Sequence, residues 1–243
     1  MTLQTFVTVH DADIVRRCEE EERFGSLGER HYLFVGQRPV ANDVPSVIPR
    51  RLVDNLEHYP HFYDFTGWWA LARHRLIVRE HVMFLQYDMQ VASPTLEADV
   101  DALLAEGDGP VAFTAGHYDA GNFLLHIGVF EDAYRHGMAA VGADMDTWPK
   151  FNEWPTTQGI AWRTDEFYDY MMWFRPLFDV WRDNVWAGHL AERTVKAWCA
   201  ERGVEPRYLG GVIVHEAQDC HGTGALMAGN VTVYEERART FAT

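Results

Sequence analysis

The stretch VMFLQYDMQV (82–91) indicates the class of fold. It is apolar through Leu85 and then turns polar at Gln86, Tyr87 and Asp88. A short apolar run of this kind is typical of a strand buried on both faces, and such strands build parallel sheets. Open α/β sheets bind their ligands at the carboxyl ends of the strands. Asp88 is therefore expected at a functional edge; the alternative is that it only caps the following turn.

Strand-like and helix-like segments alternate on both sides of this stretch. Buried strands are expected at 31–36, 110–115 and 210–215, and helices at 65–77, 93–109, 122–136, 165–182 and 187–203. We expect the aromatic helix 165–182 to bend or break near Pro176. Residues 144–163 contain two prolines and no sustained period, so they are expected to form a long loop. The alternation predicts an α/β fold with a mostly parallel central sheet flanked by helices.

The composition fits one globular domain. The chain has 243 residues, 47% of them hydrophobic and 23% charged, which excludes a disordered protein and predicts a single domain over 1–243. The formal net charge of −15 repels the phosphates of a nucleic acid polymer, whereas a single nucleotide held by a local arginine and a metal remains compatible. The aromatic residues, 14% of the chain, either fill a core or line a sugar site.

The N-terminus and the hydropathy pattern bear on location. Residues 1–25 contain acidic groups where a signal peptide needs a basic start and an apolar centre. No apolar run reaches the length of about 18 residues that a transmembrane helix needs. The three cysteines lack C-x-x-C spacing, so neither a disulfide framework nor a cysteine zinc site is suggested. We expect a cytoplasmic protein without a transmembrane segment.

Two segments supply candidate ligands for a divalent cation. The carboxylate of Asp88 suits Mg²⁺ or Mn²⁺, which would bridge to the phosphates of a nucleotide. The loop VHEAQDCHGTG (214–224) brings together four further candidates: His215, Glu216, Asp219 and His221. Their spacing is not that of an H-E-x-x-H zinc protease. His215 and His221 are expected ligands if Asp88 lies near them, and otherwise the loop is a hydrogen-bonding scaffold.

Glu192 is the candidate general base. It lies on or beside the apolar face of the expected helix 187–203, and a carboxylate partly shielded from water can accept a proton from a hydroxyl. The alternative is a surface pair with Lys196 four residues later, which would contribute only about 0.2–0.5 kcal/mol.

The segment HYPHFYDFTGWWALARHR (58–75) places polar groups among six aromatic rings. Thr66 is a candidate N-cap for the expected helix, and Asp64 can accept hydrogen bonds from ribose or sugar hydroxyls. Arg73 and Arg75 can hold a diphosphate. A core helix with a capped start would need none of these roles, so both interpretations stay open.

Four blocks together resemble bacterial surface-polysaccharide glycosyltransferases of the GT-A type. They are HYLFVGQRPV (31–40), NLEHYPHFYDFTGWWAL (55–71), VMFLQYDMQV (82–91) and AGHLAERTVKAWCAERG (187–203), and the resemblance spans roughly two thirds of the chain. It implies a GT-A-like, Rossmann-like sheet in which a strand ending in D-x-D carries the metal of the sugar nucleotide. Here only Asp88 matches, because Gln90 stands at the second acid.

The resemblance also implies site residues. The nucleotide-sugar-binding part would be 31–115, with Arg38 in its first loop, and the acceptor-side part would be 116–243. Glu192 would be the base of a hexosyltransferase, His215 or His221 would complete the metal site, and Trp154 or Trp162 would stack on the glycan acceptor. Mg²⁺ or Mn²⁺ is the implied cofactor.

Two alternatives remain from the residues. One is a metal-dependent hydrolase that uses His215, Asp219 and His221. The other is a non-catalytic carbohydrate-binding protein with a degenerate transferase site, which Gln90 would permit. The absence of G-x-G-x-x-G, P-loop and G-x-S-x-G motifs argues against a dinucleotide enzyme, an NTPase and a serine hydrolase.

Overall fold

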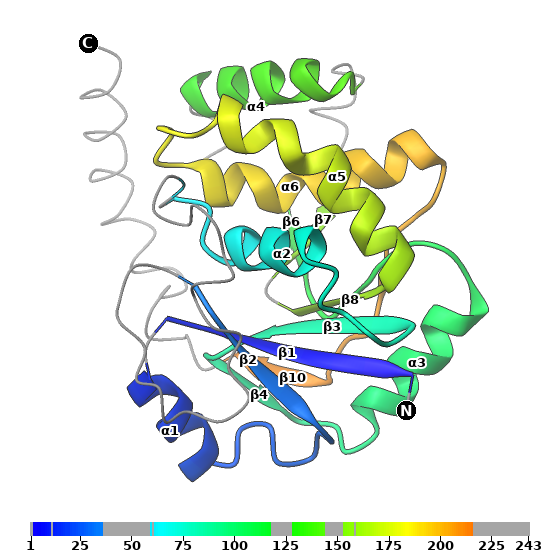
Figure 1. Ribbon diagram of the computed structural model, residues 1–243. Coiled ribbons are helices and arrows are strands. Elements are labelled where there is room, and N and C mark those ends of the chain that lie inside the picture. Colours follow the sequence, from blue (N-terminus) through cyan, green and yellow to red (C-terminus); the bar gives the residue numbers. More distant parts are fainter. Residues whose placement is uncertain are drawn as a thin grey trace.

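The structure is a computed structural model that describes residues 2–10, 12–35, 59, 61–117, 128–143, 153–157 and 159–215. Within these ranges a six-stranded sheet has the order β2-β1-β3-β8-β5-β9 (Figure 1). Its strands are β1 (Leu3–Val9), β2 (Arg30–Phe34), β3 (His81–Gln86), β5 (Val111–Ala112), β8 (Gly159–Arg163) and β9 (Arg207–Tyr208). Two small two-stranded sheets pair β4 (Met89–Val91) with β10 (Ile213–His215) and β6 (Ala115–His117) with β7 (Glu153–Pro155).

The main sheet is mixed but mostly parallel. β1 pairs in parallel with β2 and β3, and β5 pairs in parallel with β9. β8 runs antiparallel to both of its neighbours, β3 and β5. Helices cover the sheet on both faces, as the sequence predicted, and this confirms the α/β fold.

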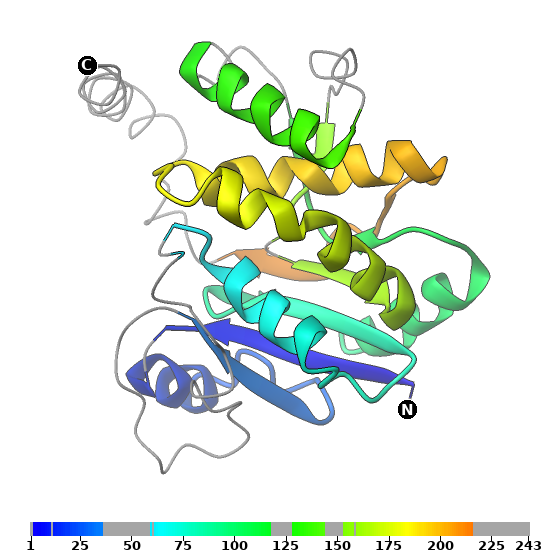
Figure 2. The same ribbon diagram turned by 45° about the horizontal axis from the view of Figure 1, so that its top comes forward.

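Alternate residues of the central strands face two separate cores. Phe6 and Phe84 face the helices α2 (Asp64–Arg73), α5 (Thr164–Val180) and α6 (Ala187–Arg202). Val7 and Leu85 face α1 (Ala12–Glu20) and α3 (Leu96–Glu106). Successive side chains of a strand point to opposite faces, so near-continuous apolar strands fill both cores. α4 (Gly128–Val141) packs outside α5 and α6 and forms the outermost layer of Figure 2.

Buried rings dominate the core under α5 and α6. Trp68 packs against both Phe84 and Phe167, with ring centroids 4.6 and 6.1 Å away, and these two rings also contact each other. Trp162 stacks on Tyr170 at 4.9 Å. The aromatic richness of the sequence is therefore largely a property of the core.

Three sequence expectations about elements were wrong. Residues 144–163 are not one long loop, because β8 within them is a central strand, and its apolar GIAWR run was masked by the nearby prolines. The expected strand 82–91 is two strands separated by a turn at Tyr87 and Asp88. Of the bend or break expected near Pro176, the break is absent: α5 continues past it, since Pro176 and Met172 lie on its exposed side, where water can bond the carbonyl that the proline leaves unpaired.

The sequence also missed β1 and misplaced two helix starts. Thr66 is inside α2 and does not cap it, because the N-cap position is Tyr63. α3 begins at Leu96 after Thr95, rather than after Ser93. The expected helix 122–136 overlaps α4 only from Gly128 onward, and residues 118–127 lie outside the description. None of the described helices combines the length and apolarity needed to cross a bilayer.

The contact between α4 and Trp181 yields a stability prediction. A Cβ at Gly137 would lie 2.1 Å from the Trp181 ring, which is fixed by a 2.8 Å hydrogen bond from its Nε1 to the Ala133 carbonyl. Gly137→Ala is expected to lower the free energy of unfolding by about 1–3 kcal/mol through overpacking, despite the better helix propensity of alanine. Urea unfolding measures the change. Gly210→Ala, where a Cβ meets nothing within 4 Å, is the control; equal stability of the two variants would contradict the prediction.

Candidate functional site

The carboxyl ends of the three parallel strands meet at one edge of the sheet. The register pairs Val9 with Phe34 and Thr8 with Gln86, so β1, β2 and β3 end together. The Tyr87 amide extends this pairing with a 3.2 Å hydrogen bond to the Thr8 carbonyl. Asp88 follows in the turn and therefore lies at the edge where such sheets bind ligands.

Asp64 lies against the same edge. It is the first residue of α2, its exposure is 8%, and the Gln86 amide donates a hydrogen bond to its Oδ2. Burial raises the pKa of Asp64 to about 7; the hydrogen bond from Gln86 opposes the rise, and the charges of Asp88 and Glu192 add to it. Asp88 and Glu192, predicted from separate segments, thus both act electrostatically on Asp64.

The raised pKa makes the protein's stability depend on pH. Between about pH 4 and pH 7 folded Asp64 keeps a proton that the unfolded chain releases, so ionisation of this group destabilises the fold progressively as pH rises. Asp64→Asn keeps an acceptor for Gln86 and removes the titration. Its stability relative to the wild type is expected to increase from pH 4 to pH 7 and then level off, as measured by urea unfolding. A constant difference across this range would show that Asp64 ionises normally.

Glu192 lies on α6 with its side chain 21% exposed. Its expected partner Lys196 instead contacts Glu205, with 2.5 Å between Nζ and Oε2. The buried guanidinium of Arg193 approaches Glu192 to 3.8 Å and donates to the His189 carbonyl at 2.6 Å. This geometry disfavours the simple surface-pair interpretation, and Glu192 is close enough to Asp64 to help raise its pKa.

The two predicted stacking tryptophans lie in different surroundings. Trp154 on β7 is 4% exposed, and the guanidinium of Arg193 lies 4.3 Å from its ring centroid. Trp162 on β8 has no exposed surface and packs between Tyr170 and Trp198. A ring with no exposed face cannot stack on a sugar, which corrects the expectation for Trp162.

α2 separates the remaining predicted binding residues. Thr66 is buried near Asp64, and its hydroxyl donates to the Tyr63 carbonyl at 2.7 Å. Arg73 is exposed at the other end of the helix, about 14 Å from Asp64 along the axis. Arg75 lies beyond it, with its guanidinium 4.2 Å from the Tyr168 ring centroid. The structure does not bring these arginines to the acids.

The backbone of His215 does come near the Asp88 turn. β10 and β4 pair antiparallel with His215 opposite Met89, the residue after Asp88. This is the proximity on which the predicted metal role of His215 depended. The side chain of His215 and all of Arg38 and His221 lie outside the described residues.

The acids at this edge are chemically suited to a divalent cation. Asp64, Asp88 and Glu192 offer hard carboxylate oxygens, and their mutual repulsion, which helps to raise the pKa of Asp64, is what a bound cation would relieve. Among the described residues no three histidine, cysteine or acidic side chains are already arranged as a metal site.

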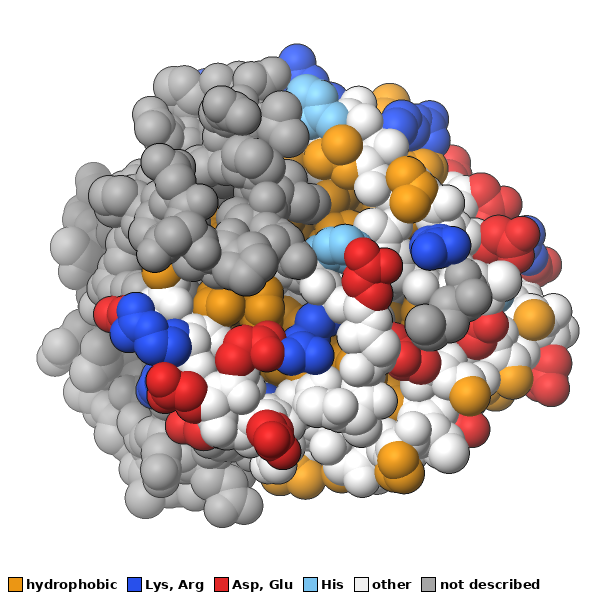
Figure 3. Space-filling model, turned by 60° about the horizontal axis from the view of Figure 1, so that its bottom comes forward, with side chains coloured by type: hydrophobic (Ala, Val, Ile, Leu, Met, Phe, Trp, Pro, Cys, Tyr) orange, Lys and Arg blue, Asp and Glu red, His pale blue; other side chains and the backbone are white. Residues whose placement is uncertain are grey.

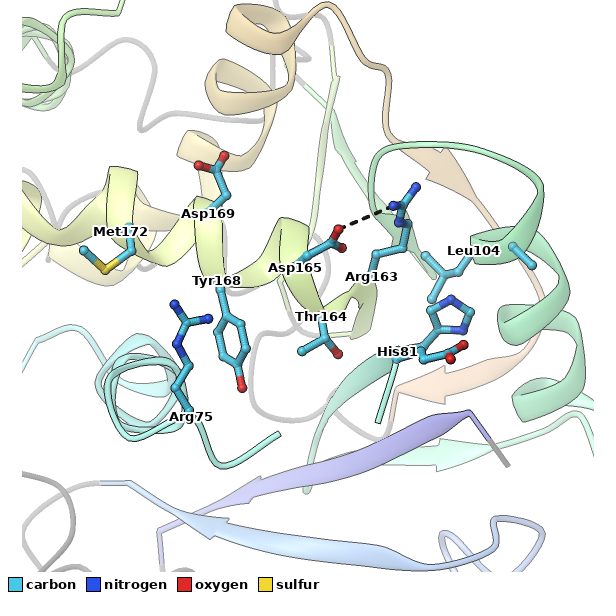
Figure 4. Close-up of a pocket in the computed structure, with 11 residues that line it drawn as sticks. Arg75, His81, Leu104, Arg163, Thr164, Asp165, Tyr168, Asp169 and Met172 are labelled. Carbon is cyan, nitrogen blue, oxygen red and sulfur yellow. Dashed lines mark hydrogen bonds and ion pairs between the residues drawn. The ribbon is translucent and has the colours of Figure 1, made fainter. Parts of the chain in front are cut away.

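A cavity of about 860 Å³ lies at the opposite edge of the sheet (Figure 4). It is bordered by Arg75, His81, Arg163 and Tyr168, and Arg163 bonds Asp165 at 3.4 Å. His81 begins β3, whereas Asp88 follows its end, so the two sites are about 20 Å apart along the strand. The cavity is therefore separate from the acidic edge.

Sequence reasoning missed two aromatic residues of the acidic edge. His10 follows β1, and its ring lies edge-on to Tyr87 with centroids 4.9 Å apart. Tyr63 precedes Asp64 with a 60% exposed side chain. The run LQTFVTV followed by His10 was the available signal for the first of these.

No protein-family model matches the chain, and no curated protein matches its sequence. Among solved structures the chain is similar to the apo structure of WbbM, a bifunctional glycosyltransferase, at 14% identity and a TM-score of 0.55, covering 89% of this chain and 46% of that one. A weaker similarity is to glucosyl-3-phosphoglycerate synthase from Mycobacterium tuberculosis, at 12% sequence identity and a TM-score of 0.46, covering 98% of this chain and 80% of that one. Another is to a glycosyltransferase involved in glycosylation of the PBCV-1 major capsid, at 10% sequence identity and a TM-score of 0.46, covering 96% of this chain and 100% of that one.

Of these three, WbbM alone exceeds a TM-score of 0.5, and its likeness concerns the fold. The chain spans less than half of WbbM while nearly all of its own length takes part in the match. The chain has a GT-A-like α/β fold.

Proposed function

We propose that the chain is a glycosyltransferase that moves a sugar from a nucleotide-diphosphate sugar to a hydroxyl of a glycan acceptor. The observation that carries the proposal is that Asp88, in the turn after β3, and Glu192, on α6, both act electrostatically on the buried Asp64 at the carboxyl edge of the parallel strands. The fold shared with a glycosyltransferase supports the same chemistry. The sequence around each acid independently predicts a role in sugar transfer: a cation ligand at Asp88, a general base at Glu192 and a hydrogen-bonding group for hydroxyls at Asp64.

Asp88 is the residue that would hold the cation, Mg²⁺ or Mn²⁺, with His215 and His221 as further candidate ligands. When bound, the cation would offset the charge of the leaving diphosphate. Gln90 has an exposed side chain on β4, so it offers an amide oxygen where the family pattern has an acid. Arg38 remains the candidate for the diphosphate, because the structure places Arg73 away from this edge.

Glu192 takes the proton from the acceptor hydroxyl, which then attacks the anomeric carbon as the bond to the diphosphate breaks. Direct displacement of this kind inverts the anomeric configuration. Asp64, with its pKa near 7, accepts or donates a hydrogen bond to a sugar or ribose hydroxyl. Trp154 is 4% exposed and packs under the guanidinium of Arg193, the residue after Glu192, so it supports the acceptor side from the core and does not stack on the sugar itself.

The proposal extends to organisation and setting. Residues 31–115 form the nucleotide-sugar part of one domain, and β1 belongs to this part because it pairs with β2 and β3. Residues 116–243 form the acceptor side. Hexosyl transfer in surface polysaccharide synthesis follows from the resemblance of the four sequence blocks. A cytoplasmic location is proposed from the three cysteines, which have neither disulfide nor zinc-site spacing. A nucleic acid polymer is an unsuitable partner because the net charge is −15 and, on the described part of the face in Figure 3, acidic and basic side chains are interspersed.

A thermal-shift screen against UDP, GDP, CDP and dTDP, each with and without Mn²⁺, tests the function. A ligand at a hundredfold excess over its Kd stabilises the native state by about 2.7 kcal/mol. A metal-enhanced shift with one nucleotide is expected and would name the donor class. No shift with any of the four would reject the transferase in favour of a hydrolase or a glycan-binding protein.

A further inference from the structure

Tyr63 is held in a backbone conformation that tyrosine rarely adopts. The Phe65 amide bonds the Phe62 carbonyl at 3.1 Å, closing a four-residue turn with Tyr63 in its second position. The angles there, φ 45° and ψ −119°, are those of the type II′ turn, where glycine is usual. Tyrosine at this position is strained, and an observed strain of this kind motivates a functional hypothesis.

The neighbouring structure holds the ring in place while leaving most of it in water. The Tyr63 carbonyl accepts hydrogen bonds from the Thr66 amide at 3.2 Å and from the Thr66 hydroxyl at 2.7 Å. One side of the ring rests on Gly188 in the first turn of α6, where a Cβ would lie only 2.6 Å from Tyr63 Cδ2. The side chain is nevertheless 60% exposed. The ring is therefore positioned without being buried.

The position of the ring relates it to the acids of the candidate site. Gly188 and Glu192 are four residues apart and share a face of α6. Side chains on a helix lean toward its N-terminus, so Glu192 leans toward the turn on which Tyr63 rests. Asp64 follows Tyr63 directly in sequence. Sugars are commonly bound by an exposed aromatic face beside carboxylates. The apolar C–H groups of the sugar pack on the ring, and its hydroxyls form hydrogen bonds with the acids.

We propose that Tyr63 is the stacking platform for the acceptor sugar. The assignment to the acceptor, rather than to the donor, rests on the proposed function, in which Glu192 deprotonates the acceptor hydroxyl. It supplies the exposed ring that the buried Trp162 cannot provide. Tyr63 belongs to the segment 31–115 proposed for the nucleotide sugar, but its ring rests on Gly188 of the acceptor part. The substrate class is a glycan that presents one sugar ring face with a free hydroxyl beside it.

Saturation-transfer NMR with the methyl glycosides of glucose, galactose, mannose and rhamnose tests the platform, with and without UDP and Mn²⁺. Wild type and Tyr63→Phe are expected to transfer saturation to the C–H protons of at least one glycoside. Tyr63→Ala and Tyr63→Gly should bind that glycoside about three- to tenfold more weakly. Tyr208→Ala, which removes another exposed tyrosine at the far edge of the sheet, should bind like the wild type.

The Tyr63→Gly variant separates function from folding, because glycine relieves the strained backbone. Its melting temperature is expected to equal or exceed that of the wild type while sugar binding weakens. A markedly lower melting temperature would show that the ring is a packing element on Gly188 and would overturn the platform. Unchanged sugar binding in Tyr63→Ala, or no saturation transfer in the wild type, would also overturn it.

Nucleotide thermal shifts on the same variants keep the two proposals distinct. Tyr63→Ala should retain the nucleotide shift of the wild type, since the ring is assigned to the acceptor. Loss of that shift in Tyr63→Ala would contradict the acceptor assignment. If the wild type shows no nucleotide shift but binds a glycoside through Tyr63, the proposed transferase function is rejected. The role of Tyr63 as a sugar-stacking platform is then retained.

Discussion

Asp88→Asn is expected to lower sugar transfer by at least 10²–10³-fold, the loss seen when one charge-stabilising group is removed from an active site. The variant should also lose the Mn²⁺-enhanced part of nucleotide stabilisation, because an amide is a much weaker ligand than a carboxylate for a hard cation. Its melting temperature should stay near that of the wild type, since Asp88 lies in a partly exposed turn and asparagine has nearly the same shape. Thermal shift with the nucleotide selected by the screen, followed by donor-consumption assays, measures both effects.

The control for Asp88→Asn is Asp165→Asn at the opposite edge of the sheet. Asp165 is also acidic and is 73% exposed beside Arg163, so its loss removes one negative charge without touching the candidate site. It should keep the metal-enhanced shift. Full transfer activity in Asp88→Asn would remove Asp88 from the metal site, whereas equal losses in both variants would point to net charge as the cause.

The sequence predicted the general fold because its strongest patterns belong to single elements. The helix expected at 187–203 carries its own periodicity and end signal and appears as expected. The apolar run from Val82 is a buried strand, although it ends at Gln86 and does not continue to Val91. β8 could not be found in the same way, because its place between β3 and β5 depends on long-range antiparallel pairing while nearby prolines suggest a loop. β1 was missed although its run LQTFVTV is apolar enough for a central strand.

The candidate site was predictable only in part. Asp88 stood out because a carboxylate ended an apolar strand, which is a local signal. Its proximity to Asp64 and Glu192 depends on how α2 and α6 pack over the sheet, and no spacing along the chain encodes that. Tyr63 left no signal, since its strain and exposure appear only once the turn before α2 and the bare backbone of Gly188 are seen together.

Trp162→Ala is expected to cost about 3–5 kcal/mol of unfolding free energy, the largest stability loss predicted for this chain. The ring is fully buried on a central strand, stacked on Tyr170 at 4.9 Å and edge-on to Trp198 at 5.5 Å, so alanine leaves a cavity that three elements would have to close. Urea unfolding measures the loss.

Trp162→Phe is the matched control for this prediction. It keeps a ring in the core and removes a buried Nε1 that has no hydrogen-bond partner among the residues that the structure describes. Relief of that unsatisfied group offsets part of the lost volume. It should therefore be much more stable than Trp162→Ala. The increase in melting temperature caused by the nucleotide should be the same in both variants as in the wild type, because Trp162 belongs to the core beneath the site. A stable Trp162→Ala protein that binds nucleotide but fails to use the acceptor would instead restore Trp162 as an acceptor residue.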